Sequence, residues 1–281
     1  MRTISRIIIA TILSSLIFIS CTDVIDVDVP EAVSRLVIEA SIDWEKGTIG
    51  NNQTVKLSTS TPFFDQEFDP ALGASVIITN DNDGSQFMFV DQNNGSYTTS
   101  NFIPQMGQSY TLEVVYEGET YTATETLTSV VDIEEVYQST DKGISDVLEI
   151  NLDFQDPANE ENYYFLKIQE LADALPALFD IKDEFVDGNL INLYYERDED
   201  EDINQEEYKA GDVVDLELYG ISKQYFEYIS LLITQFDAVD NPFGSIPVPL
   251  KGNCINELNR ENDAFGYFRL TEVVKITYTF Q

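Results

Sequence analysis

Apolar and polar residues alternate in short runs along the chain from residue 34 onward, and turn residues separate the runs. In the first run two sets of residues alternate, namely Leu36, Ile38, Ala40 and Ile42 with Val37, Glu39 and Ser41. A period of two is typical of a strand with one buried face. The pattern predicts further strands over Gln53–Thr59, Ala74–Thr79, Gln86–Val90, Tyr110–Tyr116 and Thr120–Thr126. About seven strands without a helical pattern predict an immunoglobulin-like β-sandwich over residues 34–128.

The remaining chain, residues 129–281, predicts a second β-rich domain with one amphipathic helix. Strands are expected over Val147–Phe154, Tyr163–Leu171, Leu190–Glu196, Val213–Leu218, Gly266–Phe268 and Val273–Phe280. The pattern over Leu171–Glu184 is less regular, and Pro176 limits any helix there to a short piece. Apolar residues recur at helical spacing near 222–236, after the N-cap candidate Ser222, and predict a helix packed on the second sheet.

The first twenty residues have the pattern of a secretory signal. Arg2 and Arg6 precede an uncharged run of thirteen residues, Ile7–Ile19. At about 1.5 Å per residue this run is too short to cross about 30 Å of hydrocarbon. Ser20-Cys21 then resembles the lipobox of bacterial lipoproteins, although Phe18 stands where leucine is preferred. We expect acylation of Cys21 after removal of residues 1–20; an ordinary signal with a chance cysteine is the alternative.

Residues 21–33 form an acidic tether with three aspartates. This tether resembles the signal that sends lipoproteins of Bacteroidota to the outer face of the outer membrane. A plain solvated linker is the alternative interpretation.

Charge and composition exclude several function classes. Without the signal, the chain has 13 Lys and Arg residues against 51 Asp and Glu residues, a formal charge of −38. Such a surface repels phosphate backbones, so we expect no nucleic-acid partner. Histidine is absent from the sequence, and the only cysteine besides Cys21 is Cys254. Ser/His/Asp catalysis and a Cys/His zinc site are therefore excluded, and Cys254 is expected to be a small buried residue.

The most acidic stretch, residues 198–207, places Asp198, Asp200 and Asp202 at the alternating spacing of a calcium loop. Ile203 and Lys209 occupy the positions where that loop has glycine and a bidentate glutamate. A solvated loop is therefore the simpler interpretation, and a weak calcium site through these aspartates is the alternative. No other cofactor is expected.

One loop and several aromatic residues are the candidates for a recognition surface. The segment from Asn241 through Pro242 and Phe243 to Asn253 is rich in proline and glycine and is the best candidate for a recognition loop. A structural role in closing the second domain is the alternative. The side chains of Trp44, Tyr194, Tyr195, Tyr225 and Tyr228 could supply stacking surfaces for sugars or peptides, but aromatic residues on strands more often belong to the core.

Several short segments, taken in their order and spacing, resemble one family over nearly the whole mature chain. They include Gly73-Ala74-Ser75-Val76, Gly107-Gln108-Ser109-Tyr110, Glu161-Asn162-Tyr163-Tyr164, Asn241-Pro242-Phe243 and Ala264-Phe265-Gly266-Tyr267-Phe268. The chain thereby resembles Bacteroidota lipoproteins of the domain of unknown function 4249 family, which brings no catalytic residues. The resemblance implies a lipid-anchored, non-enzymatic protein of the outer membrane, exposed at the surface, and an accessory subunit of a TonB-dependent, SusC-like transporter. The alternative is a structural or adhesive surface protein with a calcium-binding acidic loop.

Overall fold

The computed structural model describes residues 33–62, 68–143, 147–170, 173, 175–184, 186–197, 199, 206–238 and 248–281. The signal and most of the tether, including Cys21, lie outside these ranges. The same is true of the calcium candidates Asp198, Asp200 and Asp202 and of Asn241, Pro242 and Phe243 in the recognition loop. In the described part, no helix combines the length and apolar character that crossing a bilayer requires.

Seven strands form the first half, and the strand-rich architecture predicted for it is confirmed. They are β1 (Leu36–Glu45), β2 (Gln53–Thr59), β3 (Ser75–Asn80), β4 (Gln86–Asp91), β5 (Ser96–Thr99), β6 (Ser109–Tyr116) and β7 (Glu119–Thr126). β2 pairs with β1 and β5, while β6 pairs with β3 and β7, and β4 joins the two groups by pairing with both β5 and β3. The short strand β5 was not predicted, since its four residues are too few for a clear alternation.

Alternation buries one face of each strand in a common core. Ile38, Ala40 and Ile42 of β1 are fully buried, as are Tyr97 and Tyr110 from β5 and β6. The hydroxyl groups of these two tyrosines are hydrogen-bonded. That of Tyr97 donates to the carbonyl of Ala71, and that of Tyr110 donates to the carbonyl of Ile103. Satisfied hydroxyls allow these large side chains to fill the core without an unpaired polar group.

The second half adds the remaining strands and the predicted helix. They are β8 (Ile133–Ser139), β9 (Glu149–Gln155), β10 (Tyr163–Glu170), β11 (Ala177–Lys182), β12 (Leu190–Glu196), β13 (Val213–Gly220), α2 (Lys223–Asp237), β14 (Ile255–Asn256), the 3-10 turn η2 (Arg260–Asn262) and β15 (Phe265–Thr279). β12, β9 and β8 form a separate three-stranded sheet, whose apolar side chains share a core with β10 and β13. The region after Pro176, expected to be irregular, is the edge strand β11, because proline is tolerated just before an edge strand.

Helix α2 begins where the sequence predicts it. The side chain of Ser222 accepts a hydrogen bond from the backbone N–H of Tyr225 and caps the first turn. The apolar side of the helix packs on side chains from β10, β13 and β15, on the face opposite the three-stranded sheet. The prediction that this apolar stripe packs on the second sheet is confirmed.

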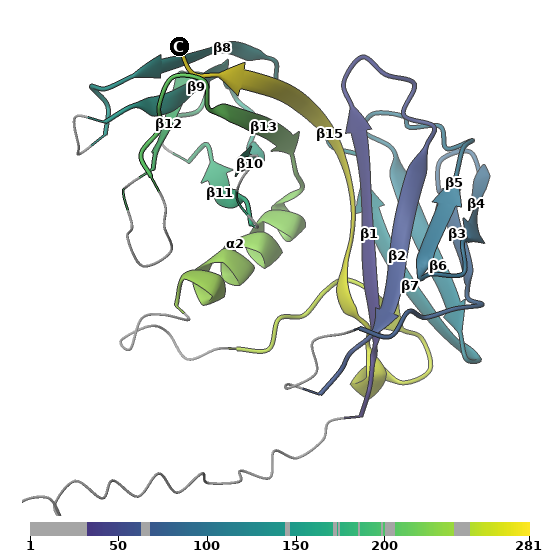
Figure 1. The fold of residues 1–281 in the computed structure, drawn as a ribbon. Helices are drawn as coiled ribbons and strands as arrows, with labels where there is room; N and C mark the ends of the chain where they lie inside the picture. Colours follow the sequence, from purple (N-terminus) through teal and green to yellow (C-terminus); the bar gives the residue numbers. More distant parts are fainter. Residues whose placement is uncertain are drawn as a thin grey trace, which may run out of the picture. The chain divides into compact units, whose positions relative to one another are not determined.

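Strand β15 links the two halves, as Figure 1 shows in yellow between β13 and β1. Its first part, Phe265–Val273, pairs in parallel with β1, and its last part, Val273–Thr279, pairs antiparallel with β13. The sequence predicts two separate strands here, but the structure has one strand of 15 residues. Strands from both sides of the boundary expected between residues 128 and 129 therefore pair with each other. β15 pairs with β1, and β14 pairs with β7.

Candidate functional site

A groove of about 570 Å³ lies between helix α2 and the outward-facing side chains of β1 and β2. We call it the α2 groove. One wall consists of Val37, Glu39 and Ser41, which alternate along β1 with the buried core residues. Thr54 and Lys56 extend this wall on β2. The volume of the α2 groove lies within the range of about 300–1,000 Å³ that is usual for ligand sites.

The floor of the α2 groove is part of β15. Gly266 lies there with φ of +89°, opposite Ile38 in the parallel ladder. A Cβ atom at this position would lie 2.1 Å from the carbonyl oxygen of Ile38. Only glycine therefore allows β15 to lie this close to β1, and the floor depends on that close approach.

The opposite wall is aromatic and aliphatic. Tyr225, Tyr228, Ile229 and Leu232 of α2 face the groove together with Tyr267 of β15. The ring of Tyr267 lies 4.7 Å from that of Tyr228 and 5.0 Å from that of Tyr225, measured between ring centroids. Burial raises the pKa of Tyr228 to about 12, so its hydroxyl stays protonated at neutral pH and can donate a hydrogen bond.

A second hollow continues the α2 groove across β2. It has a volume of about 340 Å³ and shares Val37, Glu39 and Lys56 with the first. At its far side lie Phe68, with 68% of its surface exposed, and Asn94 in the turn before β5. We call it the outer hollow. The two hollows together offer an elongated surface, with aromatic groups at both ends and Glu39 and Lys56 where they meet.

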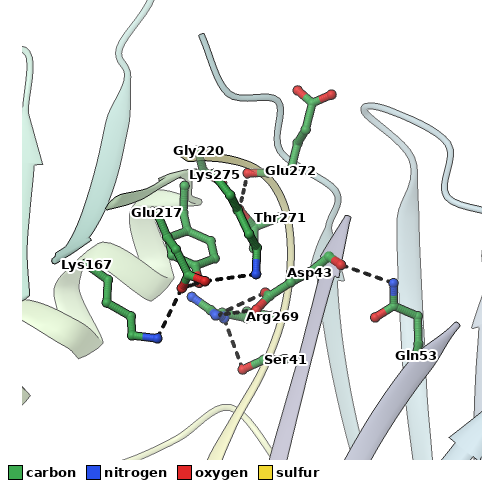
Figure 2. A network of polar contacts seen from close by, with 11 residues as sticks. Ser41, Asp43, Gln53, Lys167, Glu217, Gly220, Arg269, Thr271, Glu272 and Lys275 are labelled. Carbon is green, nitrogen blue, oxygen red and sulfur yellow. Dashed lines mark hydrogen bonds and ion pairs between the residues drawn. The ribbon is translucent and has the colours of Figure 1, made fainter. Parts of the chain in front are cut away.

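A buried polar network lies behind the α2 groove (Figure 2). Its centre is the guanidinium of Arg269 on β15, whose Nη2 lies 3.0 Å from the carboxylate of Asp43 on β1. The Nε of Arg269 donates to the hydroxyl of Ser41 over 3.1 Å. The guanidinium also lies over the rings of Tyr219 and Tyr225, at 4.8 and 5.1 Å from their centroids. Burial disfavours the charge of Arg269, but Asp43 and these tyrosines outweigh it and raise the pKa, so the arginine stays charged.

Glu217 on β13 organises the second part of the network. Its carboxylate accepts hydrogen bonds from Lys275 at 2.9 Å, Lys167 at 3.1 Å and the hydroxyl of Tyr219 at 2.6 Å. Burial alone would raise the pKa of Glu217, but these three donors outweigh burial and lower the pKa to about 2. The ionised carboxylate therefore fastens β13 to both neighbouring strands, β10 and β15.

This network fixes the walls of the α2 groove relative to each other. Arg269 contacts Ser41 of one wall and Tyr225 of the other, and both of these residues line the groove. Arg269 itself is only 8% exposed, so its contacts are with the protein. Arg269 thereby holds Ser41 and Tyr225, which line the two walls of the groove.

Asn253 belongs to the described part of the predicted recognition loop. It is 8% exposed, and its side chain bonds both the N–H and the carbonyl of Phe268, at 2.8 and 2.7 Å. These bonds fasten the end of the loop to β15, and the recognition role stays a prediction. The predictions for Cys21, for Asp198, Asp200 and Asp202 and for residues 241–243 concern positions outside the described residues and stay predictions.

The structure brings two of the five aromatic candidates together in the α2 groove, Tyr225 and Tyr228. Trp44 packs against the first core and donates from Nε1 to the carbonyl of Thr48 over 2.9 Å. Tyr195 packs against Phe179 and Tyr208, while Tyr194 on β12 is 44% exposed outside the groove. Cys254 is buried, and burial raises its pKa to about 12, which confirms the expected small core residue.

Three carboxylates that the sequence did not single out meet beside β12. Oxygen atoms of Asp156, Asp183 and Asp187 lie within 4.8 Å of one another, and the first two residues are buried. Each carboxylate also accepts a hydrogen bond from a backbone N–H of the surrounding turns. The cluster could hold a divalent cation, and its hydrogen bonds equally close the connection between β9 and β10.

The arrangement is suited to binding. The α2 groove combines aromatic and aliphatic surface, hydroxyl groups and one charge of each sign, which are the means by which proteins orient a ligand. Sequence reasoning missed Glu39, Lys56 and Tyr267, because their proximity to α2 depends on the pairing of β15 with β1. The isolated basic residue within the apolar run Tyr267-Phe268-Arg269-Leu270 was a signal for the buried network, since a charge in a buried strand requires a partner.

Solved structures with similar segments contain fibronectin type III domains or are cytokine receptors. A two-domain segment of chicken tenascin is 12% identical, with a TM-score of 0.21, over 59% of this chain and 83% of that one. Domains FN1–FN3 of chicken CNTN1 are 10% identical, with a TM-score of 0.26, over 66% and 62%. A chicken interferon gamma receptor alpha chain is 10% identical, with a TM-score of 0.21, over 66% and 86%. The fold class therefore rests on the strand pairing described above.

Among proteins with curated descriptions, none matches the chain in sequence. A family model does match, over residues 22–277, and its description is "Domain of unknown function (DUF4249)". This match covers nearly all of the chain after the predicted signal. The chain is thus a member of the DUF4249 family.

Proposed function

We propose that the protein acts by binding and that its ligand occupies the α2 groove. The observation that carries this proposal is the composition of the groove, with Tyr225, Tyr228 and Tyr267 on one side and Ser41, Thr54 and Lys56 on the other. These walls come from both halves of the chain, and the network around Arg269 holds them in place. A groove fixed in this way has little conformational freedom to lose on binding, which favours affinity.

The setting that we propose is the outer membrane, with the chain anchored through lipid on Cys21 and exposed at the cell surface. In this setting it serves as an accessory binding subunit of a TonB-dependent, SusC-like uptake complex. Support comes from the lipobox-like segment, the acidic tether and the resemblance to the accessory lipoproteins of such transporters. The strongly acidic composition also suits a protein that is held away from an anionic membrane.

Two measurements in cells test the setting. Metabolic labelling with palmitate is expected to label the wild-type chain and to leave Cys21→Ala unlabelled. Gentle cross-linking of outer membranes, followed by purification of this chain, is expected to recover a transporter barrel. An unlabelled wild-type chain would refute the anchor, and a preparation without any barrel would refute the partnership.

A structural or adhesive surface protein that binds calcium is the second proposal. The observation that favours it is the group of carboxylates at Asp156, Asp183 and Asp187, in addition to the acidic stretch of the sequence. Calcium prefers several carboxylate oxygens from loops. Thermal melting in calcium and in chelator decides the matter, since an unchanged midpoint would dismiss this proposal.

A further inference from the structure

Two opposite charges stand side by side where the α2 groove meets the outer hollow. Glu39 of β1 and Lys56 of β2 are directly opposite in the antiparallel ladder, and both side chains are exposed. Their Cβ atoms are expected about 4.5–5.5 Å apart, because they belong to one cross-strand pair. Neither side chain forms an ion pair or a hydrogen bond within the described residues. Both charged groups face solvent at the junction of the two hollows, so a ligand can reach them.

Lys56 is one of five among the thirteen described lysines and arginines that form no ion pair with a described carboxylate. Acidic residues outnumber basic ones by 51 to 15, and eight of the described lysines and arginines form ion pairs with carboxylates. Lys56 has Glu39 as its immediate neighbour and still remains outside this set. Lys56 lines both hollows, and this position keeps its ammonium group accessible to a ligand.

The surroundings of the two charges define the chemistry of a fitting ligand. The apolar wall of Tyr228, Ile229 and Leu232 receives an apolar group on one side. The hydroxyls of Ser41 and Thr54 can bond amide groups, and the outer hollow continues the path toward Phe68 and Asn94. A neutral oligosaccharide can hydrogen-bond Glu39 and Lys56 through its hydroxyl groups, but it supplies no opposite charge to either of them. A peptide supplies basic, acidic and apolar groups along one extended chain.

We propose that the α2 groove and the outer hollow bind an extended peptide segment. A basic group of the peptide pairs with Glu39, an acidic group pairs with Lys56, and a neighbouring apolar side chain packs on Tyr228 and Leu232. This inference rests on the proposed function, because it names the class of ligand for the same groove. It also gives a role to both exposed charges of the groove, which binding through aromatic stacking alone does not use.

The test uses the full chain, purified in detergent and immobilised. The probes are a tryptic digest of casein and, separately, maltoheptaose and cellohexaose. Retained peptides are identified by mass spectrometry, and the most enriched one is synthesised for calorimetry. The variants are Glu39→Lys, Lys56→Glu and the double exchange, with Glu113→Lys on the exposed side of β6 as the matched control.

Each single charge reversal is expected to weaken binding of the synthetic peptide by about tenfold or more. The double exchange is expected to recover part of the loss, because an antiparallel arrangement of the peptide can satisfy the exchanged charges, and Glu113→Lys is expected to bind like the wild type. Raising NaCl from 50 to 500 mM should also weaken binding severalfold. All variants are exposed on strands, and thermal melting checks that they are folded.

Three results would overturn the inference, and they separate it from the proposed function. If the peptide binds the wild type and both single variants equally, the charge pair is not used and the inference fails. If only an oligosaccharide binds, and Tyr228→Ala abolishes that binding, the peptide inference fails while the groove remains the site. If no probe binds the wild type, the peptide inference fails, and the proposed binding function loses its support with it.

Discussion

At the scale of single residues, the largely buried pair of Arg269 and Asp43 connects β15 to β1 beside the α2 groove. The side chain of Arg269 is 9% exposed and that of Asp43 is 28% exposed. Removing one partner of a buried ion pair leaves the other charge without compensation, which costs about 3–5 kcal/mol. A comparable pair at the surface contributes about 0–1 kcal/mol.

We therefore expect Arg269→Met to lower the free energy of unfolding by about 3–5 kcal/mol, measured by urea denaturation. The matched control is Lys223→Met, which breaks a pair with Glu161 whose side chains are more than half exposed, and it should cost much less. The double variant Arg269→Met with Asp43→Leu should recover much of the loss. Equal costs for Arg269→Met and Lys223→Met would contradict the importance assigned to burial.

Glu217 gives the stability a defined dependence on pH. Its pKa is about 2 in the folded chain against the ordinary value of 4.5, so the folded state favours the ionised form. The resulting stabilisation, on the order of 3 kcal/mol, is present above about pH 4.5 and is lost as the pH falls toward 2. Glu217→Gln should thus be less stable than the wild type at pH 7, and the difference should shrink steadily between pH 4.5 and 3. A difference in unfolding free energy that does not change with pH would contradict this assignment.

At the scale of secondary-structure elements, the α2 groove depends on β15 lying against β1. Gly266 permits this contact, because any side chain there would meet the backbone of Ile38. Gly73 has a similar positive φ of +75°, but no atom lies within 4 Å of the position its Cβ would occupy. A comparison of the same substitution at the two glycines therefore separates the cost of backbone strain from the cost of a steric clash.

We expect Gly266→Ala to destabilise the chain by several kcal/mol, and Gly73→Ala by about 1–2 kcal/mol, since only the first substitution adds a clash to the strain of a positive φ. Thermal unfolding followed by circular dichroism measures both. If the two variants melt at the same temperature, the close approach of β15 to β1 is not as tight as described.

The elements themselves were largely predictable, and their long-range pairing was not. The alternation in residues 36–42 and the spacing of apolar residues in 222–236 report on local burial, and they located β1 and α2. The parallel pairing of β1 with β15 joins Ser41 to Arg269 across 228 positions, and no local pattern encodes such a partner. The α2 groove was missed for the same reason, although Tyr225 and Tyr228 were named as candidates.

At the scale of the whole molecule, the excess of acidic residues must be tolerated by the folded state. With a formal charge of −36, repulsion among carboxylates opposes compaction. Screening lengths fall from about 30 Å at 0.01 M salt to about 8 Å at 0.15 M salt. We expect the melting temperature to rise over this range of NaCl concentration, because repulsion is screened more strongly than the buried ion pairs. A falling melting temperature would indicate that attractive surface pairs dominate.

The proposed ligand site of the molecule is the α2 groove, and a pair of tyrosine variants tests this assignment most directly. Tyr228 lies in the groove, while Tyr194 is an exposed tyrosine on β12 outside it. Calorimetry on the full chain should show that Tyr228→Ala weakens binding of the retained casein peptide, or of a bound oligosaccharide, by about tenfold, equivalent to about 1.4 kcal/mol. Tyr194→Ala should bind as tightly as the wild type. Equal affinities for the Tyr228→Ala variant and the wild type would contradict the claim.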